Sequence, residues 1–264
     1  ATQEVLARVP FATKEELDPY FSVADKTIFP SERSWRILDA IIQLAQEQGL
    51  IFCADIFSLV PAEMGNPSGW LGLRERIAEK GKVSLQKGFI KLLADRYKNI
   101  PGITWDLWNE PRLKDNDLGL LRVWARQHKE AFRENGDNHL ITIGDKMSLN
   151  LLDVLDYASV HTYNPKEFSS YRHLNQPFIF QEIWNEAGCN LDAEKKQAEK
   201  LTRNFKAFLK TKAAGFCPWQ WTRQSRLWDN ASKAEEWDDE LGACVHDDGS
   251  LKPAGKIYRT LIRN

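Results

Sequence analysis

The sequence predicts a parallel α/β barrel, the (β/α)8 or TIM barrel. Three features support this prediction: strand-like and helix-like segments alternate, no repeat or linker interrupts them, and polar side chains recur where strands end. Alternating strands and helices form a parallel sheet with the helices outside. A length of 264 residues suits one such barrel, so residues 1–264 are predicted to form a single catalytic domain.

Six segments are predicted strands because they are short apolar runs or follow turn signals. They are Leu50–Phe57, Ile103–Glu110, His139–Gly144, Tyr157–Tyr163, Pro177–Glu182 and Gly215–Trp221. Glu4–Phe11 is a candidate seventh strand, with a helix over Thr2–Val9 as the alternative. This count is one short of eight. We favour a barrel whose first strand is absent from this chain over an open sheet.

Amphipathic segments lie between the strands, with apolar residues at helical spacing. In Ser34–Gly49 the apolar side chains gather to one side, and Gly49 is placed as a C-terminal stop. The other predicted helices are Ser84–Asn99, Leu118–Asn135, Asp192–Gly215 and Pro253–Asn264.

Composition and charge exclude several classes of protein. The hydrophobic fraction of 42% predicts a soluble globular chain with a sizeable core. The net charge of -1 gives no basic excess for nucleic acid, and no run of about 18 apolar residues could span a membrane. Ten tryptophans are more than the packing of a core normally needs, so some are expected to stack on the faces of sugars. For each tryptophan the alternative is that it only fills an aromatic-rich core.

The four cysteines show no metal-ligand spacing. Cys53 and Cys217 fall in predicted strands and are expected to be small buried residues. Cys189 and Cys244 fall in loop-like stretches, and the sequence does not decide whether they form a disulfide with each other.

Polar or aromatic side chains stand at the ends of four predicted strands, where a barrel carries its functional residues. They are Asn109 with Glu110, His161 with Tyr163, Gln181 with Glu182, and Trp219 with Trp221. One polar strand end would be weak evidence, but four in chain order predict a site at one barrel mouth.

Glu110 and Glu182 are the candidate catalytic carboxylates. Two carboxyl groups about 5–5.5 Å apart can cleave a glycosidic bond with retention of configuration, one as nucleophile and one as acid and base. This chemistry needs unequal pKa values. Tyr163 is expected to donate a hydrogen bond to the nucleophile, and Asn109 to bind a sugar hydroxyl beside the reacting carbon.

These motifs resemble those of the clan A glycoside hydrolases, the retaining (β/α)8 group that includes family 5. The resembling segments are Trp108–Pro111 (WNEP), Val160–Asn164 (VHTYN), Pro177–Trp184 (PFIFQEIW), Gly215–Trp221 (GFCPWQW) and Asp248–Leu261. The resemblance covers roughly residues 34–264 and implies that Glu110 is the acid/base and Glu182 the nucleophile. It also implies that Asn109 binds sugar, that His161 and Tyr163 belong to the site, and that a tryptophan of the eighth strand forms a floor under the sugar.

A second WNE, at Trp184–Glu186, raises the question of which glutamate is the nucleophile. The strand before it is predicted to end at Glu182, which places Glu186 in the following loop. We therefore interpret the second WNE as coincidence, with Trp184 still a candidate for lining the cleft.

The sequence departs from the family pattern at three places. Phe57 stands where the third strand of the family often carries a histidine, and Ile183 and Trp184 follow Glu182 where a glycine is common. The family also places an arginine on its second strand that keeps the nucleophile ionised; Arg8 is the candidate here. The loop at Ser58–Trp70 is long, and Trp70 either stacks on a sugar or anchors that loop.

The predicted function is therefore a retaining hydrolase of β-glycosidic bonds, acting as a monomer on an oligo- or polysaccharide without metal or cofactor. One alternative is an inactive barrel that binds a glycan. Another is a metal-dependent barrel with Glu110, His161 and Glu182 as ligands. No signal peptide is visible after Ala1, although the resemblance implies an extracellular or periplasmic location.

Overall fold

The computed structural model describes residues 21–24, 27–30, 32–57, 80–111, 118–162, 164–184, 191–219, 221, 243–246 and 248–262. The chain divides into two compact units, Ala1–Ala158 and Ser159–Asn264. The candidate seventh strand at Glu4–Phe11 lies outside the described residues. The expectation of one domain over the whole chain stays a prediction.

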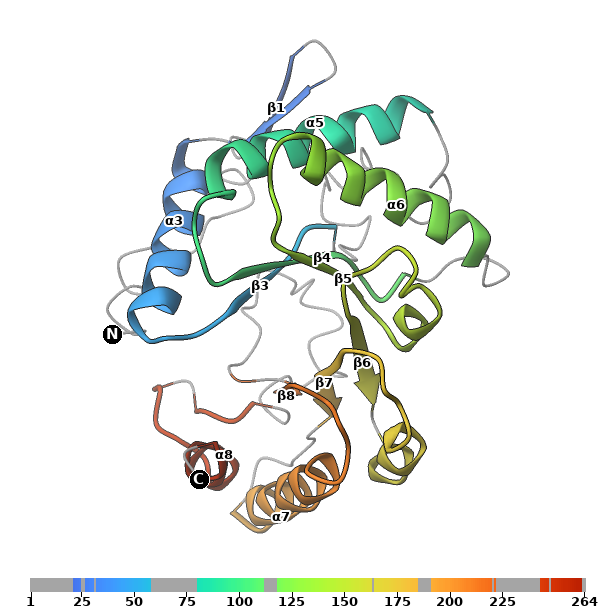
Figure 1. Ribbon diagram of the computed structural model, residues 1–264. Helices are drawn as coiled ribbons and strands as arrows, with labels where there is room; N and C mark the ends of the chain where they lie inside the picture. Colours follow the sequence, from blue (N-terminus) through green and yellow to red (C-terminus); the bar gives the residue numbers. More distant parts are fainter. Residues whose placement is uncertain are drawn as a thin grey trace, which may run out of the picture. The chain divides into compact units, whose positions relative to one another are not determined.

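The first unit holds three neighbouring parallel strands in chain order, β3 (Phe52–Asp55), β4 (Ile103–Asn109) and β5 (Leu140–Gly144). Its helices are α3 (Glu32–Glu47), α5 (Lys80–Tyr97) and α6 (Leu118–Glu134). Helices α5 and α6 lie side by side over these strands (Figure 1). The three strands and three helices confirm the predicted elements, with ends that shift by a few residues.

An antiparallel hairpin that the sequence analysis did not predict precedes these elements. Strand β1 (Phe21–Ala24) pairs with β2 (Thr27–Pro30), and β2 contacts α5. Strand segments of four residues are too short for a period-2 pattern to stand out.

The second unit takes nearly all of β6 (Ala158–Thr162), and with it β7 (Phe178–Trp184) and β8 (Phe216–Trp219). Its helices are the 3-10 helix η5 (Pro165–Tyr171), α7 (Leu191–Phe208) and α8 (Pro253–Leu261), and α7 packs against α8. All six predicted strands are present. A second 3-10 helix, η4 (Lys146–Asn150), follows β5 in the first unit, and neither 3-10 helix was predicted.

Helix α7 ends at Phe208, seven residues before the predicted end at Gly215. The Thr211 hydroxyl donates to the Phe208 carbonyl (2.7 Å) and accepts from the Ala213 amide (3.2 Å), so it satisfies groups that a helix end leaves open. Ala214 then donates to the Phe178 carbonyl (2.9 Å), which starts the pairing of β8 with β7.

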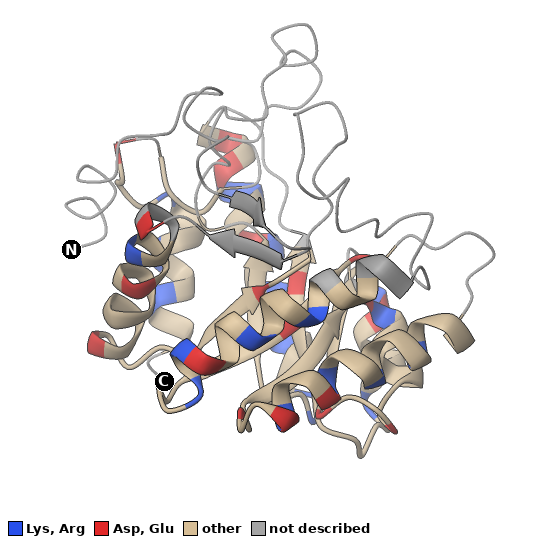
Figure 2. Ribbon diagram, turned by 90° about the horizontal axis from the view of Figure 1, so that it is seen from above, with Lys and Arg blue, Asp and Glu red and all other residues tan. Residues whose placement is uncertain are grey.

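Aromatic side chains dominate the buried core of each unit. Trp105, Trp108, Phe57 and Phe132 are fully buried in the first, and Phe168, Phe178 and Phe180 in the second. The core therefore accounts for part of the aromatic content without any sugar contact. Lys, Arg, Asp and Glu of both signs are interspersed along the helices (Figure 2). Among the described residues, none of the helices has the length and apolar character that a membrane crossing requires.

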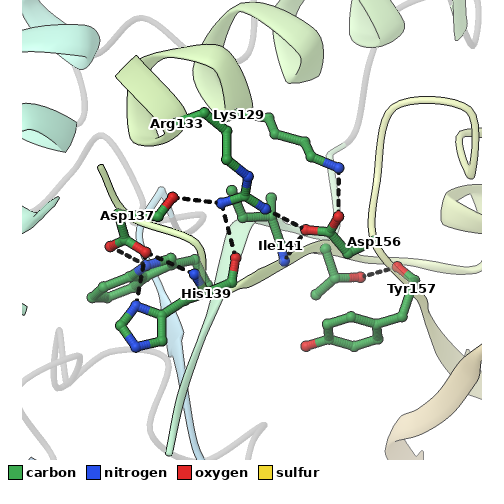
Figure 3. A network of polar contacts seen from close by, with 9 residues as sticks. Lys129, Arg133, Asp137, His139, Ile141, Asp156 and Tyr157 are labelled. Carbon is green, nitrogen blue, oxygen red and sulfur yellow. Dashed lines mark hydrogen bonds and ion pairs between the residues drawn. The ribbon is translucent and has the colours of Figure 1, made fainter. Parts of the chain in front are cut away.

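A polar network ties α6 to the start of β5 (Figure 3). The Asp156 carboxylate accepts from Lys129 Nζ (2.5 Å), Arg133 Nη2 (2.8 Å) and the Ile141 amide (2.9 Å). The fully buried Asp137 accepts from Trp105 Nε1 (3.1 Å), and its other oxygen accepts from the His139 amide (2.8 Å). These contacts fix the end of the strands opposite to the one that carries Asn109 and Glu110.

Candidate active site

A β-bulge in β4 decides which way its last residues point. Asp106 pairs with Thr142 and Asn109 with Gly144, so three steps on β4 match two steps on β5. Thr142 and Gly144 are two apart and share a face of the sheet, and their partners Asp106 and Asn109 therefore share a face as well.

The packing of two tryptophans agrees with this register. Trp105 stacks on Phe132 (ring centroids 5.4 Å apart) and Trp108 contacts Trp124 edge-on (5.5 Å), and both partners belong to α6. Residues three apart on a regular strand would face opposite sides. The bulge lets both tryptophans face the helix, and it turns Asn109 to the side that Thr104 and Asp106 share.

Glu110 follows β4 directly and has an unusual backbone conformation. Its φ is 48°, and it is the only residue other than glycine with a positive φ among those whose backbone is described. The left-handed conformation costs a residue with a Cβ about 1–2 kcal/mol. The Glu110 amide donates to the Gly144 carbonyl (2.8 Å), and its side chain is half-buried. Strain of this kind at a candidate acid supports a functional hypothesis.

Strand β7 carries a second bulge at the other candidate glutamate. Phe180 pairs with Phe216 and Ile183 with Pro218, so three steps on β7 again match two on β8. Phe216 lies against Phe208 of α7 (5.3 Å between ring centroids), and Pro218 shares its face. Phe180 and Ile183 are therefore both on the helix side, and Gln181 and Glu182 both occupy the opposite face.

Strand β6 contacts these two residues with alternate side chains. The Ser159 hydroxyl donates to Gln181 Oε1, and His161 Nδ1 lies 3.5 Å from Glu182 Oε2. His161 is buried, and the Glu182 side chain keeps 16% of its surface exposed. A half-buried carboxylate beside an imidazole has the composition of a nucleophile site, and it equally offers two ligand types for a divalent ion.

The end of β7 corrects one sequence expectation. The strand continues two residues beyond Glu182 to Trp184, which pairs with Trp219 of β8. The predicted strand end at Glu182 is therefore wrong, because the bulge takes up one extra residue and pairing with β8 then resumes. Glu186 and the side chain of Trp184 lie outside the described residues, so the choice between the two glutamates stays a prediction.

The two tryptophans predicted at the end of β8 have different positions. Trp219 is the last residue of the strand and is half-buried. Trp221 lies beyond the strand, which ends two residues earlier than predicted, and its ring is 6.1 Å from that of Tyr258 in α8. Trp221 is 42% exposed. A sugar contact by either residue remains a prediction.

Phe57, which departs from the family pattern, belongs to the helix-facing core. It is 1% exposed and lies 5.8 Å from the rings of both Trp124 and His128 in α6. It therefore fills the core of the first unit. The predicted site residues Arg8, Trp70 and Tyr163 lie outside the described residues, as does Cys189.

Two residues that brace the bulges were not predicted from the sequence. Asp106 is fully buried, and its Oδ1 accepts from the amides of Trp108 (3.1 Å) and Gly144 (2.8 Å). Its signal was a lone acidic residue inside the apolar run of β4. Ser159, which bonds Gln181, is an ordinary small residue in its strand and offered no such signal.

Solved structures share the fold of this chain at low sequence identity. An endo-1,4-β-mannanase from Rhizomucor miehei matches with a TM-score of 0.62 and 13% identity over 93% of this chain and 82% of that one. A GH5_18 protein from Streptomyces cattleya, in complex with Manβ1-4GlcNAc, has a TM-score of 0.62 and 17% identity over 89% and 67%. Cel5A from Thermotoga maritima, with cellobiose, has a TM-score of 0.62 and 13% identity over 92% and 81%. The predicted (β/α)8 fold class is confirmed.

Two curated relatives match a shorter stretch. Mannan endo-1,4-β-mannosidase A from Podospora anserina is 39% identical over 61 residues, and the enzyme of the same name from Aspergillus aculeatus is 34% identical over 61 residues. Each match covers 23% of this chain and 16% of the relative.

The model of one protein family, described as "Cellulase (glycosyl hydrolase family 5)", matches residues 6–225, which is most of the chain. This match includes β4 with Glu110 and β7 with Glu182. The chain belongs to glycosyl hydrolase family 5.

Proposed function

We propose that this protein is a retaining glycoside hydrolase that cleaves β-glycosidic bonds, with Glu182 as nucleophile and Glu110 as acid and base. The observation that carries the proposal is that Glu110 directly follows the bulged end of β4 and Glu182 lies within the bulge of β7, in a family 5 chain. Bulges near strand ends commonly re-aim side chains at active sites. The left-handed φ of Glu110 adds support, since strained backbone clusters at such sites.

The proposed reaction has two steps. In the first, a Glu182 oxygen forms an ester bond to the anomeric carbon as the glycosidic bond breaks, and Glu110 gives its proton to the leaving oxygen. In the second, Glu110 takes a proton from water, the water oxygen attacks the anomeric carbon, and Glu182 leaves as a carboxylate. A proton on His161 Nδ1, 3.5 Å from Glu182 Oε2, would favour the ionised nucleophile.

The substrate class we propose is β-1,4-linked glycan that contains mannose. Both curated relatives are named mannan endo-1,4-β-mannosidases, and two of the similar structures are a mannanase and a protein with bound Manβ1-4GlcNAc. The Thermotoga maritima structure with cellobiose makes β-glucan the first alternative. A panel of mannan, cellulose derivatives and β-linked aryl mannosides and glucosides separates these substrates.

The nucleophile is tested by Glu182→Ala on an aryl β-glycoside with a good leaving group. We expect activity to fall at least a thousandfold and azide to restore turnover, giving a glycosyl azide of inverted configuration. Glu186→Ala is the matched control from the second WNE and should keep near-normal activity. Equal losses in both variants, with azide rescue only in Glu186→Ala, would assign the nucleophile to Glu186.

The same panel decides between an enzyme and a glycan-binding barrel. Binding of a mannan oligosaccharide to the wild-type chain, without hydrolysis of any panel member, would favour the binding protein.

A further inference from the structure

A buried aspartate beside the bulge of β4 contacts the backbone of β4, of β5 and of the residue that follows β3. The Asp106 side chain is 0% exposed, and it is the only charged residue of the strand. Its backbone carbonyl accepts from the Ile56 amide just after β3 (2.9 Å). Its Oδ1 accepts from the Trp108 amide of β4 (3.1 Å) and from the Gly144 amide of β5 (2.8 Å).

These two amides lie where the bulge interrupts the ladder between β4 and β5. The regular pairing stops at Asp106 and resumes at Asn109, and the Glu110 amide then donates to the Gly144 carbonyl (2.8 Å). A buried amide that loses its acceptor costs about 1–3 kcal/mol. One carboxylate oxygen serves both donors, so the bulged pairing keeps its hydrogen bonds although the ladder is broken.

The bulge has a directional consequence for the proposed site. If the side chains of β4 alternated regularly, Asn109 would lie on the face of Trp105, which packs against Phe132 of α6. The bulge places it on the face of Asp106, and the next residue is Glu110, held in the left-handed region. Whatever stabilises the bulge therefore decides where Asn109 and Glu110 point.

We propose that Asp106 is a positioning residue, whose Oδ1 stabilises the β4 bulge and so aims Asn109 and Glu110. Its catalytic consequence rests on the proposed function, in which Glu110 protonates the leaving group. Its structural role does not depend on the reaction: Oδ1 holds the bulge and, through Gly144, the backbone of Glu110.

Three variants separate positioning from mere stability. Asp106→Ala removes the acceptor of both amides, whereas Asp106→Asn keeps one carbonyl oxygen and nearly the same volume. Asp137→Ala is the matched control, because Asp137 is also 0% exposed and accepts from Trp105 Nε1 (3.1 Å) and the His139 amide (2.8 Å). All are compared with Glu110→Ala at a temperature well below every melting transition.

The activity measurement is kcat/KM on a series of aryl glycosides whose leaving groups differ in pKa. For Asp106→Ala we expect a loss of about a hundredfold on poor leaving groups, the effect of a misplacement of about 1 Å, and a small loss on the most activated one. Asp106→Asn should recover most of this loss. Asp137→Ala should lower the melting temperature without a dependence on leaving group.

The structural measurement is a crystal structure of Asp106→Ala. We expect Asn109 to leave its pairing with Gly144 or Glu110 to leave the left-handed region. An unchanged bulge and an unchanged Glu110 backbone would overturn the proposal, whatever the kinetics. If Glu110→Ala shows no leaving-group dependence, the proposed role of Glu110 fails. If Glu110→Ala shows it and Asp106→Ala does not, only the positioning role fails.

Discussion

His128 shows how strongly the first unit excludes water from its helix-facing core. Its Nδ1 lies 2.7 Å from the Trp124 carbonyl oxygen and its Nε2 lies 2.8 Å from Gln86 Oε1. The imidazole is fully buried against Trp124, with ring centroids 4.0 Å apart. Burial disfavours the charged form and lowers the pKa of His128 to about 4 from an ordinary value of 6.5.

This shift predicts a pH dependence of stability. In the unfolded chain His128 takes up a proton near pH 6.5, whereas in the folded chain it stays neutral down to about pH 4. The stability that the neutral His128 contributes to the folded state is therefore complete above pH 6.5 and is lost as the pH falls toward 4. Between pH 7 and pH 5 this residue should cost the wild type about 2 kcal/mol of unfolding free energy.

Urea unfolding of the wild type and of His128→Leu at both pH values measures this contribution. The variant should lose about 2 kcal/mol less than the wild type over the same interval, whatever its absolute stability. Parallel losses in the two proteins would show that His128 is not kept neutral by the fold.

Asp106 and Glu182 show, at the same scale, how much a residue's type reveals. An acidic residue within an apolar strand indicates that the fold provides partners for it, because an unpaired buried charge is expensive. Which partners it has depends on Gly144, 38 positions further along the chain. For Glu182 the residue type and its family context indicated a catalytic role, while its contact with His161 came from the structure.

Among the elements, α6 organises the first unit. One face receives Trp105 and Trp108 from β4, and its last turns carry Lys129 and Arg133 to the Asp156 carboxylate (Figure 3). The contact with Trp108 depends on the bulge, whereas the ionic contacts clamp the helix to the start of β5.

Asp156→Ala is predicted to loosen this clamp. It leaves Lys129, Arg133 and the Ile141 amide, all at least partly buried, without their shared acceptor, and it should cost about 2–3 kcal/mol of unfolding free energy. Asp153→Ala is the control, because its partners Arg122 and Arg126 are 40% and 53% exposed and such pairs contribute about 1 kcal/mol or less.

Denaturant unfolding and kcat/KM are to be measured together for both variants. Activity per folded molecule should be unchanged in both, since these residues lie at the start of the strands. Equal stability in the two variants would show that the Asp156 cluster behaves as an exposed ion pair.

At the scale of the whole molecule, the stereochemistry of the product tests whether the two glutamates act on one bond. Carboxyl groups about 5–5.5 Å apart give retention, and groups about 6.5–9.5 Å apart leave room for water and give inversion. We predict retention. Proton NMR in the first minutes of hydrolysis should show the β-anomer before mutarotation, and an α-anomer appearing first would refute the double displacement.

The family assignment and the fold agree at this scale, although the sequence left particular features open. The alternation of strands and helices predicted all six described barrel strands, because a buried parallel strand and an amphipathic helix each leave a local pattern. The hairpin of β1 and β2 left no such pattern because each of its strands has only four residues. Helix α7 ends early because the Thr211 side chain caps it and Ala214 then pairs with Phe178 of β7.

By itself, the sequence determined the order of the six barrel strands and their helices, the family, and the two glutamates at or near the ends of β4 and β7. Those properties follow from residue types and their spacing, which are local. The tertiary structure decided which face Asn109 and Glu182 occupy. Regular alternation would have turned Asn109 to the side of Trp105 and Glu182 to the side of Phe180, both of which pack on helices. The bulges reverse this, because a bulge exists only relative to a neighbouring strand, and β5 and β8 are those neighbours.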